Sequence, residues 1–209
     1  MNTRRNLLVG LGAAALGVAA WRTNTDTSLV ETLPASGDAT DASYFPNLTL
    51  YTHEGKAVRF YDDLIRGKVV AINMMYASCS GICPTTTANL RLVQKLLGER
   101  VGRDVFMYSL SLQPELDTPQ ILKTYAERHH VGPGWWFLTG APADIERLRY
   151  SLGFYDPDPL VDGNIANHSG LLRIGNDTYK RWTMAPALAD PEQILATINH
   201  VDGAVVHTG

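Results

Sequence analysis

Apolar positions along residues 45–209 fall into short patterns that predict several strands. A nearly continuous apolar run at 68–76 has the length and character of a central strand buried on both faces. Shorter apolar runs predict two more strands, at 105–112 and 135–139. Paired runs around polar turns predict hairpins at 48–60 and 171–184.

Amphipathic segments between these strands predict helices with recognisable first residues. The predicted starts are Cys83-Pro84, Asp117-Thr118-Pro119, Pro142 and Asp190-Pro191. In the second helix Asp117 is expected to cap the first turn and Ile121 to face inward. The alternation predicts an α/β fold, a mixed sheet flanked by helices with an N-terminal hairpin. This pattern is compatible with a thioredoxin-like domain, and a doubly wound flavodoxin-like order is the nearest rival.

One segment inside the domain has neither a strand nor a helix pattern. Residues 155–167 are rich in Asp, Pro, Gly and Asn, and His168 follows them just before a hydrophobic strand. Long irregular loops inside a compact domain are uncommon and are usually functional or disordered. We therefore expect this loop to carry function and His168 to be held at a sheet edge.

The first residues have the character of an export signal. Arg4-Arg5 precede an Ala- and Gly-rich apolar run at 7–21, about 15 residues long, which is shorter than a typical membrane span. The paired arginines resemble a twin-arginine signal. We interpret residues 1–22 as an export signal or N-terminal membrane anchor, 23–44 as a flexible tether, and 45–209 as the folded domain. The expected location is the periplasm, or the outer face of the inner membrane.

Composition narrows the function classes. The chain has 18 Lys and Arg against 21 Asp and Glu, a net charge of −3, so no basic face for nucleic acid is indicated. Its two cysteines, Cys79 and Cys83, are too few for a disulfide-rich fold or an all-cysteine zinc site.

The two cysteines stand where the central strand passes into a helix. Positions i and i+4 lie on one face of a helix, about 5–6 Å apart, so these thiols can share a metal or close a disulfide. The positive helix end favours the thiolate form that both uses require. A purely structural disulfide would close so short a loop that it gains only about 2 kcal/mol. Copper(I) prefers soft thiolate ligands at low coordination number and accepts imidazole as well.

A third ligand would come from the histidines. The chain has six, at His53, His129, His130, His168, His200 and His207. Five of them are expected in turns, at helix ends or after the last helix, whereas His168 follows the irregular loop. His168 is therefore the favoured candidate.

Ordered motifs between residues 45 and 201 resemble the Sco/SenC family. They are Gly67-Lys68-Val69-Val70, the Cys79-Ser80-Gly81-Ile82-Cys83-Pro84 motif, Pro114-Glu115-Leu116-Asp117-Thr118-Pro119, Leu138-Thr139-Gly140 and His168-Ser169. The resemblance implies a thioredoxin-like fold with a hairpin insertion, and a copper site made by Cys79, Cys83 and His168. It further implies a role in delivering copper to, or reducing the cysteines of, the dinuclear copper centre of cytochrome c oxidase.

The sequence departs from the family pattern at two places. The family usually has proline and an acidic residue where Ser80 and Gly81 stand, and Asp where Gln113 stands. Both departures remove a carboxylate from the expected surroundings of the metal or of the partner surface.

Two functions remain open from the sequence. The first is a copper chaperone that passes copper to a receiving protein, such as the copper subunit of cytochrome c oxidase. The second is a thiol-disulfide oxidoreductase in which Cys79 attacks and Cys83 resolves. Against the second, thioredoxin-type enzymes have two residues between their cysteines, whereas this chain has three.

Overall fold

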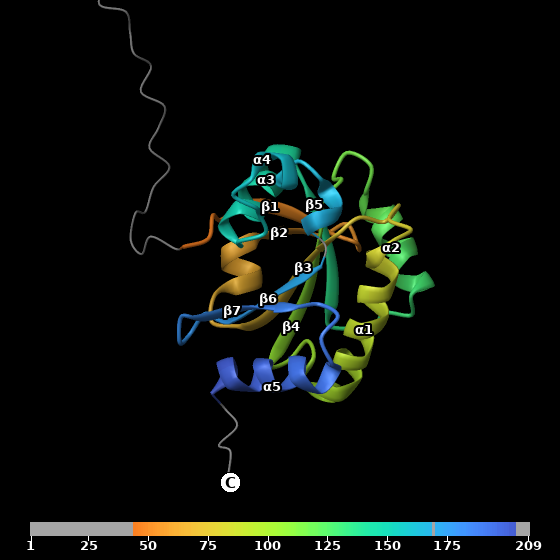
Figure 1. Ribbon diagram of the computed structural model, residues 1–209. Helices are drawn as coiled ribbons and strands as arrows, with labels where there is room; N and C mark the ends of the chain where they lie inside the picture. Colours follow the sequence, from red (N-terminus) through yellow and green to blue (C-terminus); the bar gives the residue numbers. More distant parts are fainter. Residues whose placement is uncertain (1–43, 169, 204–209) are drawn as a thin grey trace, which may run out of the picture. The chain divides into compact units, whose positions relative to one another are not determined.

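A computed structural model of the chain describes residues 44–168 and 170–203 (Figure 1). Seven strands form one mixed sheet in the order β2-β1-β5-β4-β3-β6-β7. The strands are β1 (Thr49–Thr52), β2 (Ala57–Arg59), β3 (Val69–Met75), β4 (Val105–Ser111), β5 (Trp135–Gly140), β6 (Leu171–Asn176) and β7 (Arg181–Pro186). The predicted α/β class, mixed sheet and two hairpins are confirmed.

The three central strands β3, β4 and β5 run parallel, and their carboxyl ends meet at one edge of the sheet. All seven residues of β3 are buried, as the continuous apolar run predicts. Met75 at the end of β3 pairs with Ser111 at the end of β4. The segments that leave these two strands therefore start side by side, where open α/β sheets commonly place their sites.

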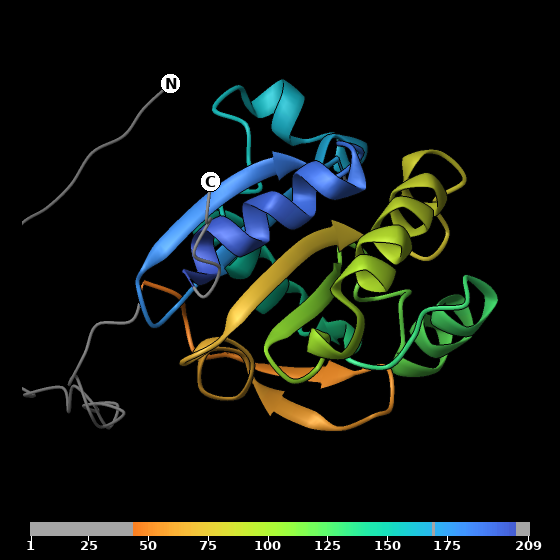
Figure 2. The same cartoon turned by 90° about the horizontal axis from the view of Figure 1, so that it is seen from below.

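Helices cover both faces of this sheet (Figure 1). The α-helices are α1 (Ile82–Leu97), α2 (Pro119–Arg128), α3 (Pro142–Ser151), α4 (Pro159–Asp162) and α5 (Pro191–Asp202). Buried residues of α1, α2 and α5 pack in one core cluster, and those of α3 pack in a second. Figure 2 shows α1 and α5 lying across the same face of the sheet. The two-sided cover explains why β3 has no polar face.

Antiparallel pairing brings a distant segment to the edge where β3 ends. β6 runs antiparallel beside β3, with Leu172 opposite Asn73. The beginning of β6 therefore lies near the carboxyl end of β3. His168, three positions before β6, belongs to the chain that approaches this edge.

Three expectations about local structure are wrong. Residues 155–167 contain the short helix α4 and the start of a 3₁₀ helix at Ile165–His168, so they are not an irregular loop throughout. Thr118, not Asp117, caps α2, because its side chain accepts the backbone N–H of Ile121. Ile121 is 44% exposed and does not face inward. A π-helix at Phe60–Ile65 has no counterpart in the sequence prediction.

The proposed export signal at 1–22 and nearly all of the tether at 23–44 lie outside the described residues, as does His207. Within residues 44–168 and 170–203, no helix has both the length and the apolar character to cross a membrane.

Candidate metal centre

The two cysteines lie in and just after the turn that joins β3 to α1. Cys79 is in the turn, where its backbone N–H donates to the carbonyl of Tyr76 at 3.1 Å. Cys83 is the second residue of α1. Both cysteines are thiols that form no disulfide, and they are 8% and 1% exposed. The strand end and the helix start thus hold both thiols inside the core cluster beneath α1.

The Cys79 sulfur is surrounded by hydrogen-bond donors. Burial raises the pKa of the Cys79 thiol, but hydrogen bonds from the Cys83 thiol, the Cys83 and Gly81 backbone amides and the Tyr76 hydroxyl outweigh it. The net effect lowers the pKa of Cys79. Because a thiolate is both the nucleophile and the metal ligand, this environment prepares Cys79 for either role.

A buried carboxylate fixes the backbone just before the cysteines. Asp117 is 2% exposed, and its two oxygens accept the backbone N–H of Ala77 at 3.3 and 3.1 Å. Ser111 Oγ donates to the same carboxylate at 2.6 Å. The segment after β4 therefore holds the segment after β3. The sequence pattern predicts only a helix-capping role for Asp117 and gives no sign of this contact, although the adjacent Thr118 and Pro119 indicate that another residue could cap α2.

Both positions that depart from the family pattern lie at this site. Gln113 stands beside the cysteine turn, and its Oε1 accepts the Ser78 hydroxyl at 3.0 Å. A Cβ atom added at Gly81 would lie 4.0 Å from the Cys79 sulfur, an ordinary van der Waals distance. The backbone at position 81 therefore leaves room for a side chain, and the missing carboxylate is not imposed by steric crowding.

The backbone of the His168 segment reaches the cysteine-bearing helix. His168 is the last residue of the 3₁₀ helix Ile165–His168, and its side chain lies outside what the structure describes. Two residues later, a Cβ atom added at Gly170 would lie 3.6 Å from Cδ1 of Ile82, the neighbour of Cys83. Gly170 O also accepts the backbone N–H of Ala187 at 2.9 Å, which fixes this stretch against the strand pair β6–β7.

The other described histidines have different surroundings. His53 accepts the backbone N–H of Phe137 on Nδ1 at 3.1 Å, and burial lowers its pKa. The ring of His129 lies 4.2 Å from that of Tyr125, centroid to centroid. His130 and His200 are exposed. Among the described side chains, no group of three or more His, Cys, Asp or Glu residues is arranged to hold a metal ion.

Tyr125 is a buried residue of α2 that lies near both cysteines and Asp117. Its hydroxyl hydrogen-bonds to Thr87 at 2.9 Å. Burial and the nearby negative charges of Cys83, Cys79 and Asp117 together raise the pKa of Tyr125 to about 12, although the hydrogen bond with Thr87 lowers it. A neutral phenol therefore lies beside the thiols.

Comparison with known proteins connects this geometry to one family. Residues 37–202 match the family model described as SCO1/SenC. A SCO1 protein homologue of Bacillus subtilis is 34% identical over 133 residues, which cover 62% of this chain and 67% of the relative. The chain spans between 41% and 67% of the length of the curated relatives that it matches.

Solved structures confirm the thioredoxin-like fold. Bradyrhizobium japonicum ScoI, solved with copper bound, is 25% identical, has a TM-score of 0.58, and is matched over 73% of this chain and 96% of that one. A second structure is that of BsSco, a member of the Sco family of cytochrome c oxidase assembly proteins in which a disulfide switch has been identified. It is also 25% identical, with a TM-score of 0.60 and coverage of 76% of this chain and 92% of that one.

Proposed function

Because the chain belongs to the SCO1/SenC family, we propose that it is an exported copper chaperone. In this proposal Cys79, Cys83 and His168 hold one copper ion, which passes to a respiratory copper centre such as that of cytochrome c oxidase. The whole proposal rests on the family, on the two thiols and on the path of the chain at His168.

The close approach of the Gly170 backbone to Ile82 is the observation that carries the ligand set. It places the chain two residues after His168 against the first residue of the helix that bears Cys83. Two residues of backbone span at most about 7 Å, so position 168 lies close to Gly170 along the chain, which supports its imidazole as the third ligand.

The donor set suits copper(I) better than zinc. Two buried sulfurs and one imidazole make a three-coordinate site, whereas a structural zinc site requires four ligands. The donors around Cys79 favour the thiolate, which is the form that binds a metal ion. Cys79 is also the more exposed of the two thiols, which makes it the natural first contact for a receiving protein.

A copper titration tests this ligand set. The reduced domain, comprising residues 45–209, is titrated with copper(I) in competition with a chromogenic chelator, as wild type, His168→Ala and His200→Ala. We expect one copper per chain, and removal of one of three ligands should weaken binding by about 10- to 100-fold in His168→Ala. His200 is exposed on α5, so His200→Ala should bind like the wild type.

Two results would count against the proposal. Equal affinity of His168→Ala and wild type would remove His168 from the ligand set. Absence of stoichiometric binding by the reduced wild type would remove copper as the cargo.

A second candidate function, thiol-disulfide exchange, is favoured by the thiol pair itself. The lowered pKa of Cys79 and the hydrogen bond between the thiols suit a nucleophile and its resolving partner. The Cys79 thiolate would attack a partner disulfide and release one partner thiolate. Cys83 would then attack the mixed disulfide, leaving an oxidised Cys79–Cys83 pair and a partner with two thiols. The step transfers two electrons from this chain to the partner.

Turnover of a disulfide substrate separates the two functions. If the chain is an oxidoreductase, the reduced domain should reduce a model disulfide peptide at the same rate in wild type and His168→Ala, and Cys83→Ser should accumulate the mixed disulfide. No reduction above the rate of a free dithiol would exclude this activity.

Export is proposed from the sequence alone. The paired arginines Arg4 and Arg5 and the apolar run after them support export through the twin-arginine route. Fractionation of cells that express the full chain tests this proposal: Arg4→Lys/Arg5→Lys should retain the protein in the cytoplasm, whereas Arg22→Lys should not.

A further inference from the structure

We propose that a groove between α3, α4 and the segment after β4 docks a basic, apolar segment of the protein that receives the copper. This inference rests on the proposed function, because it names the kind of surface that the receiving protein presents. The groove has a volume of about 700 Å³, enough for several side chains of an extended segment.

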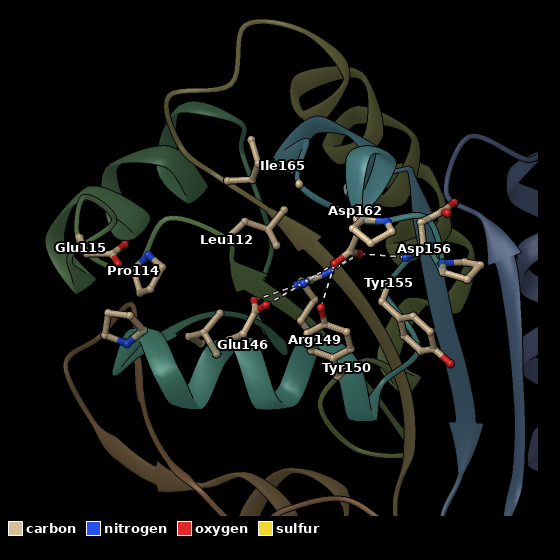
Figure 3. Close-up of a pocket in the computed structure, with 15 residues that line it drawn as sticks. Leu112, Pro114, Glu115, Glu146, Arg149, Tyr150, Tyr155, Asp156, Asp162 and Ile165 are labelled. Carbon is tan, nitrogen blue, oxygen red and sulfur yellow. Dashed lines mark hydrogen bonds and ion pairs between the residues drawn. The ribbon is translucent and has the colours of Figure 1, made fainter.

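The groove has an apolar floor made of rigid side chains. Leu112 and Ile145 line it, together with Tyr150 and Tyr155, whose ring centroids lie 5.5 Å apart (Figure 3). The two tyrosines are 47% and 53% exposed, so their rings are accessible to a bound segment. Aromatic rings of this kind bind aliphatic side chains and also the cationic heads of lysine and arginine.

The charges around the groove favour a cationic occupant. Arg149 is the one basic residue that lines it, and its guanidinium already binds two carboxylates (Figure 3). It donates to Glu146 at 2.7 and 2.9 Å and to Asp162 at 2.7 and 2.9 Å. Glu115 is exposed and has no ion-pair partner among the described residues. Together with Asp156 it leaves the rim negative, which attracts a basic segment and repels an acidic one.

The walls of the groove are continuous with the segments that form the proposed metal site. One wall is formed by Leu112, Pro114 and Glu115. Ser111 and Gln113 of the same segment contact Asp117 and Ser78 beside the cysteine turn. The other wall ends at Ile165, the first residue of the 3₁₀ helix that ends at His168. A segment bound in the groove would therefore contact both the support of the cysteines and the chain that carries His168.

Peptide binding tests the groove without any copper. The probes are two short fluorescein-labelled peptides, one of alternating lysine and leucine and one with glutamate in place of lysine. The variants are Glu115→Lys and Tyr155→Ser. Their matched controls are Glu99→Lys, an exposed acid at the far end of α1, and Tyr51→Ser, an exposed tyrosine on β1.

We expect the wild type to bind the lysine peptide and to bind the glutamate peptide at least about tenfold more weakly. Glu115→Lys and Tyr155→Ser should each weaken binding of the lysine peptide by about fivefold or more, and the controls by less than about twofold. Equal binding of the two peptides, no binding at all, or equal losses in variants and controls would overturn the groove assignment.

A transfer assay then separates the groove from the proposed function. Copper-loaded protein is mixed with the soluble copper-binding domain of a cytochrome oxidase subunit. Glu115→Lys should slow transfer about fivefold while its copper affinity and its rate of copper loss to a small chelator stay at the wild-type values. An unchanged transfer rate would overturn the docking role. If the wild type fails to bind copper, the proposed function fails, and the peptide experiment still decides whether the groove binds a basic segment.

Discussion

The carboxylate of Asp117 accepts the backbone N–H of Ala77, which lies 40 residues earlier in the chain. The contact joins the segment after β4 to the segment after β3, two positions before Cys79. Ser111 donates to the same carboxylate, so the group is buried with partners on both sides. This one side chain links the edge of the sheet to the geometry of the cysteine turn.

Removal of the Asp117 carboxylate should destabilise the domain and loosen this turn. Asp117→Ala leaves the Ala77 amide and the Ser111 hydroxyl without an acceptor, so we expect the free energy of unfolding to fall by about 2 kcal/mol. Asp117→Asn, which keeps one carbonyl oxygen, should cost less. Urea unfolding measures the loss of stability, and hydrogen exchange at the Ala77 amide measures the loosening of the turn. Asp104→Ala, which removes an exposed ion pair with Arg103, should change stability by less than about 0.5 kcal/mol. Unchanged exchange at Ala77 in Asp117→Ala would contradict this role.

The hydroxyl of Tyr76 should contribute to the reactivity of Cys79. Tyr76→Phe removes one donor to the sulfur, so the pKa of Cys79 should rise and alkylation of the metal-free protein by iodoacetamide at neutral pH should slow by about fivefold. The rate-against-pH curve should shift to higher pH. Tyr51→Phe, on an exposed strand position, is the matched control. Superimposable curves for Tyr76→Phe and wild type would show that the hydroxyl does not act on the thiol.

His53 should make stability fall in mild acid. Burial lowers its folded-state pKa below the ordinary value of 6.5, so the unfolded chain binds the proton more tightly than the folded one. The contribution of His53 is fully present above about pH 6.5 and declines as the pH falls through the folded-state pKa. His53→Asn keeps an acceptor for the Phe137 amide without titrating, so its stability should fall less between pH 7.5 and 5.5. His200→Asn provides the matched exposed control, and equal slopes for wild type and His53→Asn would refute the assignment.

Arg149 should hold the segment that precedes His168. Its guanidinium also donates to the carbonyl of Phe154 at 2.9 Å, and Asp162 in turn accepts the backbone N–H of Asp156 at 2.9 Å. A lysine cannot reproduce this planar set of donors. Arg149→Lys should therefore increase the rate of limited proteolysis within residues 155–165 several-fold. Arg103→Lys, at an exposed ion pair, should be cleaved like the wild type. Equal cleavage rates for Arg149→Lys and wild type would show that another contact fixes this segment.

Sequence reasoning predicted the elements whose signals are local. The apolar run that becomes β3 is buried along its whole length, and Asp190 caps α5 as the Asp-Pro pair predicts. The same pair at Asp158-Pro159 starts α4, where the Asp158 side chain accepts the backbone N–H of Leu160. This capping signal is present in the sequence, but the helix has only four residues and no apolar face, so no periodic pattern follows the cap to predict it.

Features that depend on distant contacts could not be predicted. The role of Asp117 requires the pairing of β3 with β4, and the approach of Gly170 to Ile82 requires the pairing of β3 with β6. Ile121 has the spacing of a core residue, yet its side chain is 44% exposed in the fold. The two cysteines were recognisable because their spacing is local, whereas their hydrogen-bond donors became visible only in the fold.

The approach of Gly170 to Ile82 also determines at which stage of folding the proposed site can form. Cys79 and Cys83 become neighbours as soon as α1 starts, but the chain at Gly170 approaches α1 only after β6 has paired with β3. If the proposed ligand set is right, an unfolded or partly folded chain has the two sulfurs near each other but lacks the third ligand. Tight copper binding would then be confined to molecules whose sheet is complete. Copper affinity would therefore distinguish fully folded molecules from partly folded ones.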